Sequence, residues 1–201
     1  MMSRQRRLLA WLLLSLCAVA LGIAGGAALV RWRGPAQRPP DVGGMGAKEA
    51  FVIARVWAQT WQSDAELVNC TTSRRRGVTV NDGWTFQIYS AQRQTIAMVR
   101  VQDKELSVLR ESPALFSQSP LPLDSWQVDS DDAIATWWSH GGQQVWAHAA
   151  TEALHLRLGL TAQERLVWQI TVSYAQSSAL DLWEMAADSG EVLSYPAGRE
   201  L

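Results

Sequence analysis

One stretch decides the fold: residues 166–195 read LVWQITVSYAQSSALDLWEMAADSGEVLSY. Its first part alternates strictly, with Trp168, Ile170 and Val172 on one side and polar residues between them. This period of two predicts an antiparallel strand that has one buried face. Residues 188–191 (DSGE) then predict a tight turn between two strands, in which Gly190 takes a left-handed conformation.

The same pattern occurs earlier in the chain. Trp84 and Trp168 are 84 residues apart, and this offset holds over 26 positions without a gap. It pairs Phe86 with Ile170, Ile88 with Val172, Ala91 with Ala175, Gln92 with Gln176, Val99 with Trp183, Val108 with Val192 and Leu109 with Leu193. Strands and hairpin remain in phase throughout, which predicts an internal duplication.

Each predicted copy begins with an amphipathic helix. Residues 47–61 place Ala50, Ala54 and Trp57 on one stripe. The second helix opens at Ser130, a hydroxyl N-cap followed by two acids, and residues 141–142 (GG) are predicted to end it. We therefore predict an α+β fold of two tandem α-β-β-β modules, each a helix on an antiparallel sheet. The predicted core includes Trp57, Trp84, Trp137 and Trp168.

The N-terminal region predicts a membrane anchor. Residues 8–30 carry no charge and are long enough to cross a bilayer as a helix. A cleaved signal peptide is one alternative, and a lipoprotein signal at Cys17 is another, although Leu16 stands where a small residue is expected. We favour an uncleaved span with the C-terminal part outside the cell, while arginines on both sides weaken the positive-inside signal.

The predicted domain organisation follows from these patterns. It comprises a basic tail (1–7), a transmembrane helix (8–30), a Pro/Gly-rich linker (31–46), a first module (47–112), a connector (113–129) and a second module (130–195). The linker cannot form a packed core and is expected to hold the modules near the membrane surface.

Charge and cysteine content exclude several classes of protein. The chain has 201 residues, with 18 Lys and Arg against 19 Asp and Glu, but seven of the bases precede residue 49. The rest of the chain has a net charge of −7, which excludes a typical nucleic-acid-binding domain. Cys17 lies in the apolar run, so Cys70 stands alone in the folded part and no disulfide framework is possible.

Residues 166–195, together with DSDDAIATWW at residues 129–138, resemble the PepSY-like domain family. Residues 187–193 (ADSGEVL) match the Ser-Gly-Glu-Val-Leu part of the turn that is typical of its last hairpin. The whole layout also resembles the membrane-anchored cell-wall elongation regulators of Gram-positive bacteria, with a degenerate first copy. The resemblance implies a fold in which one helix is followed by a three-stranded sheet. It also implies a function of binding or inhibiting a peptidase, or of engaging a penicillin-binding protein.

The sequence contains no recognisable catalytic signature. The three histidines (His140, His148 and His155) do not have the spacing of a metal site, and no Gly-x-Ser-x-Gly elbow occurs. Cys70 is interpreted as a strand residue rather than a nucleophile. We therefore predict no catalytic residue, no metal and no cofactor.

Two groups of residues are candidates for binding. Trp183 and Met185 are out of phase with Leu180 and Leu182, which are expected to point into the core. The pair therefore lies either on the outer face of the sheet, where it would bind a partner, or between the two copies. Arg74, Arg75 and Arg76 form a basic loop, which is either a solvated turn or a contact with anionic headgroups at the membrane surface.

The sequence thus predicts a membrane-anchored, non-enzymatic module that binds or inhibits an extracytoplasmic peptidase or cell-wall enzyme. The alternative is an external sensory or structural module of a signalling complex. No nucleic-acid partner is expected.

Overall fold

The computed structural model describes residues 38–80 and 82–196. The first half contains α2 (Ala47–Trp61), β1 (Ala65–Arg75), β2 (Trp84–Ser90), β3 (Thr95–Gln102) and β4 (Glu105–Pro113). The second half contains the short helix η1 (Leu123–Ser125), α3 (Ser130–Trp137), the π-helical turn η2 (Trp138–Gly142), α4 (Gln143–Ala147), β5 (Thr151–Leu160), β6 (Leu166–Tyr174), β7 (Leu180–Ala186) and β8 (Val192–Ser194). Helix followed by strands is therefore the order in both halves.

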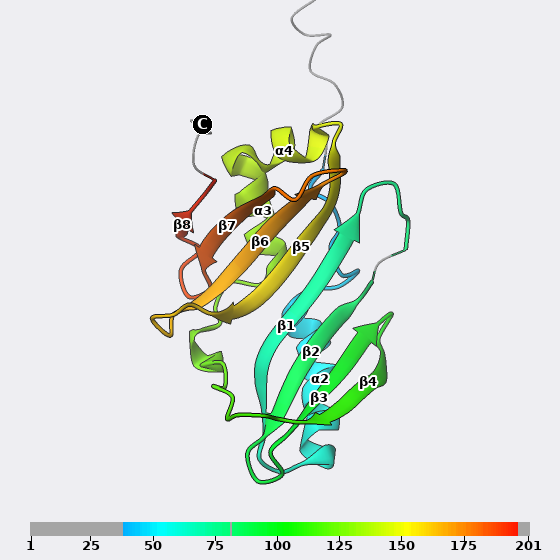
Figure 1. The fold of residues 1–201 in the computed structure, drawn as a ribbon, viewed down its shortest axis with the longest axis vertical. Coiled ribbons are helices and arrows are strands. Elements are labelled where there is room, and N and C mark those ends of the chain that lie inside the picture. The colour runs from blue at the N-terminus through cyan, green and yellow to red at the C-terminus, as the bar shows by residue number, and fades with distance from the viewer. Residues whose placement is uncertain (1–37, 81, 197–201) are drawn as a thin grey trace, which may run out of the picture. The chain divides into compact units, whose positions relative to one another are not determined.

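All strands of the described residues form one antiparallel sheet in the order β4-β3-β2-β1-β5-β6-β7-β8. The α-helices lie on one face of this sheet, and Figure 1 shows the opposite face, which within the described chain is not covered by a helix. We call this second face the open face. The mixed α+β class and the antiparallel sheet are as predicted.

The two halves join through β1 and β5. Thr72 is paired with Leu156, which lies 84 residues later in the chain. On either side, Cys70 pairs with Leu158, and Arg74 pairs with Leu154. Residue 70 plus 84 is residue 154, and residue 158 minus 84 is residue 74, so exchanging the two halves turns the first pair into the second. The pairing of β1 with β5 is therefore unchanged by the exchange. The seam between the halves is therefore pseudo-two-fold symmetric about the Thr72–Leu156 pair.

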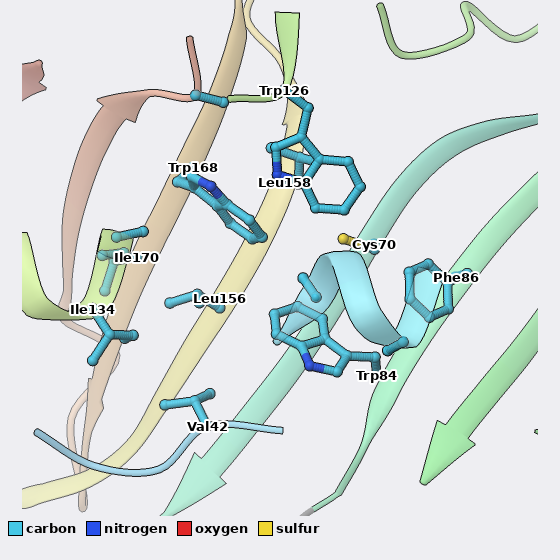
Figure 2. Packing of buried hydrophobic residues seen from close by; sticks show 14 of the residues in the cluster. Val42, Cys70, Trp84, Phe86, Trp126, Ile134, Leu156, Leu158, Trp168 and Ile170 are labelled. Atoms are coloured by element: carbon cyan, nitrogen blue, oxygen red, sulfur yellow. The ribbon is translucent and has the colours of Figure 1, made fainter. Parts of the chain in front are cut away.

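One hydrophobic core lies between the sheet and the helices. Figure 2 shows three tryptophans from both halves, Trp84, Trp126 and Trp168, gathered around the seam with Leu156 and Leu158. Trp84, Trp137 and Trp168 are fully buried, as predicted, whereas Trp57 is half-buried and stacks on Trp61 with ring centroids 5.5 Å apart. Each large apolar side chain buried in this way contributes about 1.5–3 kcal/mol.

Helix α2 has the predicted bounds, and its buried stripe is made of alanines: Ala47, Ala50, Ala54 and Ala58. Its first turn is capped from the other half of the chain. The amide of Ala47 donates to Ser130 Oγ (3.0 Å), and the amide of Lys48 donates to Asp129 Oδ1 (3.1 Å). Asp129 is also the N-cap of α3, so the prediction that Ser130 fills this role was wrong by one residue.

The predicted number of strands per module was too small. Each half of the described chain contributes four strands rather than three. The strands at the two ends of the sheet are the weakest, because β8 has three residues and β4 is exposed along most of its length.

The turns follow the predicted chemistry in part. Gly190 has a φ of 78°, the left-handed conformation expected of it. The corresponding turn between β3 and β4 has no glycine, and Asp103 and Lys104 both adopt positive φ there, as in a type I′ hairpin. Residues 141–142 do interrupt the second helix, with Gly141 at φ 97°, but the chain returns to helical geometry in α4.

In residues 38–80 and 82–196, no helix is long and apolar enough to cross a membrane. The basic tail, the predicted span at residues 8–30 and residues 31–37 of the predicted linker lie outside the described residues. The rest of the linker does not behave as predicted, because Val42 is buried in the hydrophobic core and Met45 packs against it.

Candidate functional site

A single row of paired residues crosses the open face from β3 to β7. In order, the row consists of Arg100, Thr85, Thr71, Arg157, Gln169 and Glu184. Side chains of residues paired across strands project from the same face of a sheet. The seam between β1 and β5 therefore brings two arginines that are 57 residues apart in the chain into one polar row.

A groove of about 640 Å³ lies over this row. Its lining is mostly hydroxyl-bearing and basic and includes Thr71, Ser73, Thr85, Arg100, His155 and Arg157. Leu180 borders it and is 62% exposed. The groove is open to solvent and centred on the seam, so it depends on both halves of the chain.

Two arginines dominate the charge of the groove. Arg157 is exposed, and its guanidinium lies over Gly159, where an added Cβ would come within 3.3 Å of Arg157 Nε. The absence of a side chain at Gly159 thus lets the arginine lie along the sheet. Arg100 is half-buried, and its Nε is inaccessible to solvent and has no hydrogen-bond partner among the described residues. A buried N–H without a partner carries a free-energy cost, so a partner for this donor would be stabilising.

The carboxylates at the margins of the groove are engaged by neighbouring side chains. Asp82 Oδ2 accepts a hydrogen bond from Ser73 Oγ (2.5 Å). At the far end of the row, Glu184 Oε1 accepts from Gln169 Nε2 (2.9 Å). Neither Arg100 nor Arg157 forms an ion pair with an acid within the described residues.

The predicted partner-binding pair is buried. Trp183 is 4% exposed and Met185 is 3% exposed, and both point to the helix side of the sheet. Trp183 pairs with Ile170 and Met185 with Trp168, both core residues. The exposed-pair interpretation was wrong because Leu180 and Leu182, which were assumed to point inward, lie on the open face instead.

The prediction of a basic loop was wrong for two of the three arginines: Arg74 and Arg75 are the last two residues of β1 and pair with β5, and only Arg76 lies in the turn that follows. Arg76 Nη1 donates to the carbonyl of His148 (2.5 Å), and Arg74 Nη1 donates to the carbonyl of Val80 (3.3 Å). Arg75 is exposed, as are Val78 and Val80 nearby. The end of β1 and the segment after it therefore present basic and apolar side chains, and their contact with a membrane remains a prediction.

The remaining reactive groups do not form a centre. Cys70 is fully buried on β1, and burial raises the pKa of its thiol well above the usual range, so it is held as the unreactive thiol. Within residues 38–80 and 82–196, no group of three His, Cys, Asp or Glu residues is placed to hold a metal ion. His148 packs edge-on against Tyr174, while His155 lies on the open face in the groove.

The sequence analysis did not single out Arg100 or Arg157. Alternation did place Thr85 and Gln169 opposite the buried tryptophans, on the face that proves to be open. The residues that lie beside them depend on the pairing of β1 with β5, and a local pattern does not contain this long-range register.

No model of a known protein family matches the chain. No curated protein matches its sequence. Among solved structures, the chain is similar to a crystal structure of a predicted lipoprotein from Clostridium difficile 630, with 11% sequence identity and a TM-score of 0.48. The similarity covers 73% of this chain and 91% of that one.

Proposed function

We propose that this chain is a membrane-anchored, non-enzymatic binding module of the bacterial cell envelope that takes a protein partner on the open face of its sheet. The observation that carries the proposal is the asymmetry of the sheet. The helices cover one face, whereas the other presents a polar, basic groove centred on the seam. A grooved surface of this kind, without a catalytic constellation among the described residues, is suited to recognition rather than to chemistry.

The partner class comes from the resemblance of residues 129–138 and 166–195 to PepSY-like domains. By that resemblance, the partner is an extracytoplasmic peptidase or a cell-wall enzyme such as a penicillin-binding protein, which this chain binds or inhibits. An external module of a signalling complex is the competing assignment, in which the captured partner is a sensor protein.

Tandem duplication of a single module supports a binding role. The 84-residue offset in the sequence relates the two halves, and the β1–β5 register maps onto itself under the same offset. A module duplicated in this way gains a composite surface at the seam that one copy alone does not have. The groove lies on this surface, with Arg100 from the first copy and Arg157 from the second.

The membrane attachment is supported by the uncharged run at residues 8–30 and the Pro/Gly-rich linker that follows it. In this proposal the anchor and linker hold residues 39–196 close to the membrane. In that position Arg75, with the exposed Val78 and Val80, is available to contact anionic headgroups.

Site-specific photo-crosslinking in living cells tests the proposal. A photo-reactive residue replaces Leu180 at the border of the groove, and a matched control carries it at Val56, which is also 62% exposed but lies on α2. We expect a protein adduct at Leu180 and none at Val56, with a peptidase or a cell-wall enzyme identified by mass spectrometry.

Capture of a sensor protein at Leu180 instead would assign the chain to the signalling complex. Equal adducts at both positions, or none at either in a protein that is folded and membrane-bound, would contradict a partner on the open face.

A further inference from the structure

The geometry points to an extended peptide segment of the partner as the occupant of the groove, with two acidic side chains about four residues apart. This inference rests on the proposed function and specifies the chemistry of the partner. It is carried by the positions of Arg100 and Arg157, by the hydroxyl groups between them and by the charge of their surroundings.

The spacing of the two arginines sets the spacing of the acids. Arg100 and Arg157 stand three strands apart in one row, with Thr85 and Thr71 between them. Adjacent strands are about 4.8 Å apart, so the two backbone positions are separated by about 14 Å. An extended peptide advances about 3.3–3.6 Å per residue, so four residues span about the same distance.

The side chains between the arginines suit a peptide backbone. Thr71 and Thr85 line the groove, and each hydroxyl can both donate and accept a hydrogen bond. Guanidinium groups bind carboxylates through two parallel hydrogen bonds, a geometry that fixes the direction of approach. Arg100 Nε has no partner among the described residues and is inaccessible to solvent, so a bound carboxylate reaches it only when the Arg100 side chain moves.

Charge complementarity favours an acidic segment over a neutral or basic one. Although the chain after residue 48 has a net charge of −7, the lining of the groove itself contains Arg100 and Arg157 against one carboxylate, that of Asp82. The nearby carboxylates of Asp82 and Glu184 are held by Ser73 and Gln169. A basic segment would bring like charges together in the groove, whereas an acidic one forms ion pairs there.

Binding of defined peptides to the full-length chain in detergent tests the inference. The probe is a fluorescein-labelled peptide of Ser and Thr with two glutamates four residues apart, followed by fluorescence anisotropy. One control peptide has the same composition with adjacent glutamates, and a second has glutamines in their place. We expect the spaced peptide to bind most tightly and its affinity to fall as salt is raised, because exposed ion pairs are screened.

Variants locate the binding on the protein. Arg157→Gln and Arg100→Gln are each expected to weaken binding of the spaced peptide about threefold to tenfold. The matched control is Arg55→Gln, since Arg55 is an exposed arginine on α2, on the other face of the sheet. Arg157 is exposed, so its variant keeps the fold, and circular dichroism checks this for all three. Arg100→Lys retains the charge and is expected to lose only part of the affinity.

The outcomes separate this inference from the proposed function. A protein adduct at Leu180 in cells, with no preference for the spaced peptide, would overturn the inference and leave the function standing. Absence of both would overturn both. If a second copy of the chain occupied the groove, sedimentation of the full chain would show a concentration-dependent dimer that Arg157→Gln disrupts. That result would also overturn the inference that a peptide segment of a partner binds there. An adduct that maps to an acidic segment of the captured enzyme supports the inference.

Discussion

Trp84 and Trp168 form the same hydrogen bond in the two halves of the chain and meet edge to face at the seam. Trp84 Nε1 donates to the carbonyl of Met45 (2.8 Å), and Trp168 Nε1 donates to the carbonyl of Val128 (2.9 Å). Each acceptor lies two residues before the first residue of a helix. The two rings are 6.0 Å apart with an interplanar angle of 62°. The tryptophans thus fix the start of each helix to the sheet and also join the halves.

The environments of the two carbonyls differ, which predicts unequal effects of removing each indole N–H. Val128 also accepts a hydrogen bond from Trp126 Nε1 (3.0 Å), so Trp168→Phe leaves this carbonyl with a partner. Trp84→Phe removes the indole donor from Met45. We expect Trp84→Phe to lower the free energy of unfolding by about 1 kcal/mol more than Trp168→Phe, because an unsatisfied polar group costs about that much. Urea denaturation of both variants measures the difference. Equal losses would show that the second donor at Val128 contributes nothing.

Asp129 is predicted to stabilise two helices at once. Its carboxylate accepts from the amide of Ser130 in α3 and from the amide of Lys48 in α2. Loss of one capping side chain costs about 0.5–2 kcal/mol. We therefore expect Asp129→Ala to lower the free energy of unfolding by about 2 kcal/mol or more, and Asp129→Asn to retain most of the stability. The control is Asp132→Ala, an exposed acid in the first turn of α3. A loss no larger than that of the control would rule out the double cap.

Trp183 is predicted to act in the core rather than in binding. Its side chain is 4% exposed and contacts Tyr195, with ring centroids 6.0 Å apart. Trp183→Ala is expected to lower the free energy of unfolding by about 3–5 kcal/mol, as large-to-small changes in a core do. Leu182→Ala, its neighbour on the open face, should change it by less than about 0.5 kcal/mol. Thermal and chemical denaturation compare the stabilities of the two variants. A Trp183→Ala protein as stable as the unsubstituted chain would make Trp183 a candidate binding residue again.

Asp64 predicts a pH dependence of stability. The amide of Gln92 (2.8 Å) and the hydroxyl of Ser90 (2.8 Å) both donate to its carboxylate, and they hold the pKa of Asp64 below its ordinary value of 3.8. The ionised form is therefore favoured in the folded protein. Its stabilising contribution is present above the unfolded-state pKa and is lost as the pH falls through the lower folded-state pKa.

Asp64→Ala should accordingly lower the melting temperature at neutral pH, and the difference from the unsubstituted chain should narrow as the pH falls below about 3.8. Glu105→Ala, at an exposed position on β4, serves as the control. A difference that stays constant with pH would mean that the carboxylate acts through its shape rather than its charge.

Local patterns in the sequence predicted the parts of this fold that depend on neighbours along the chain. The period of α2 and the alternation around Trp84 and Trp168 gave most of the buried residues, because burial on one side of an element leaves a regular signal, although Trp57 is only half-buried. The direction of β7 was misjudged, since Leu180 and Leu182 are apolar yet exposed, while Trp183 and Met185 are buried.

The groove was not predictable from such patterns. Arg100 and Arg157 belong to different halves and come into one row only through the β1–β5 register. In isolation, each is simply a charged residue on the outward side of a strand, which is where most charged residues lie. The pairing of β1 with β5, which gives them a common role, is a long-range contact that depends on the fold of the whole chain.

Joining the halves at the centre of the sheet also determines what remains at its two edges. Of the described strands, β4 and β8 lie at the ends of the order. β4 carries Glu105, Arg110 and Glu111 and closes with Pro113, while β8 has three residues. Short strands, charges and proline are the features that discourage one sheet from extending onto another. Both edges of the described sheet thus carry features that oppose polymerisation, which leaves the open face as the surface for the partner we propose.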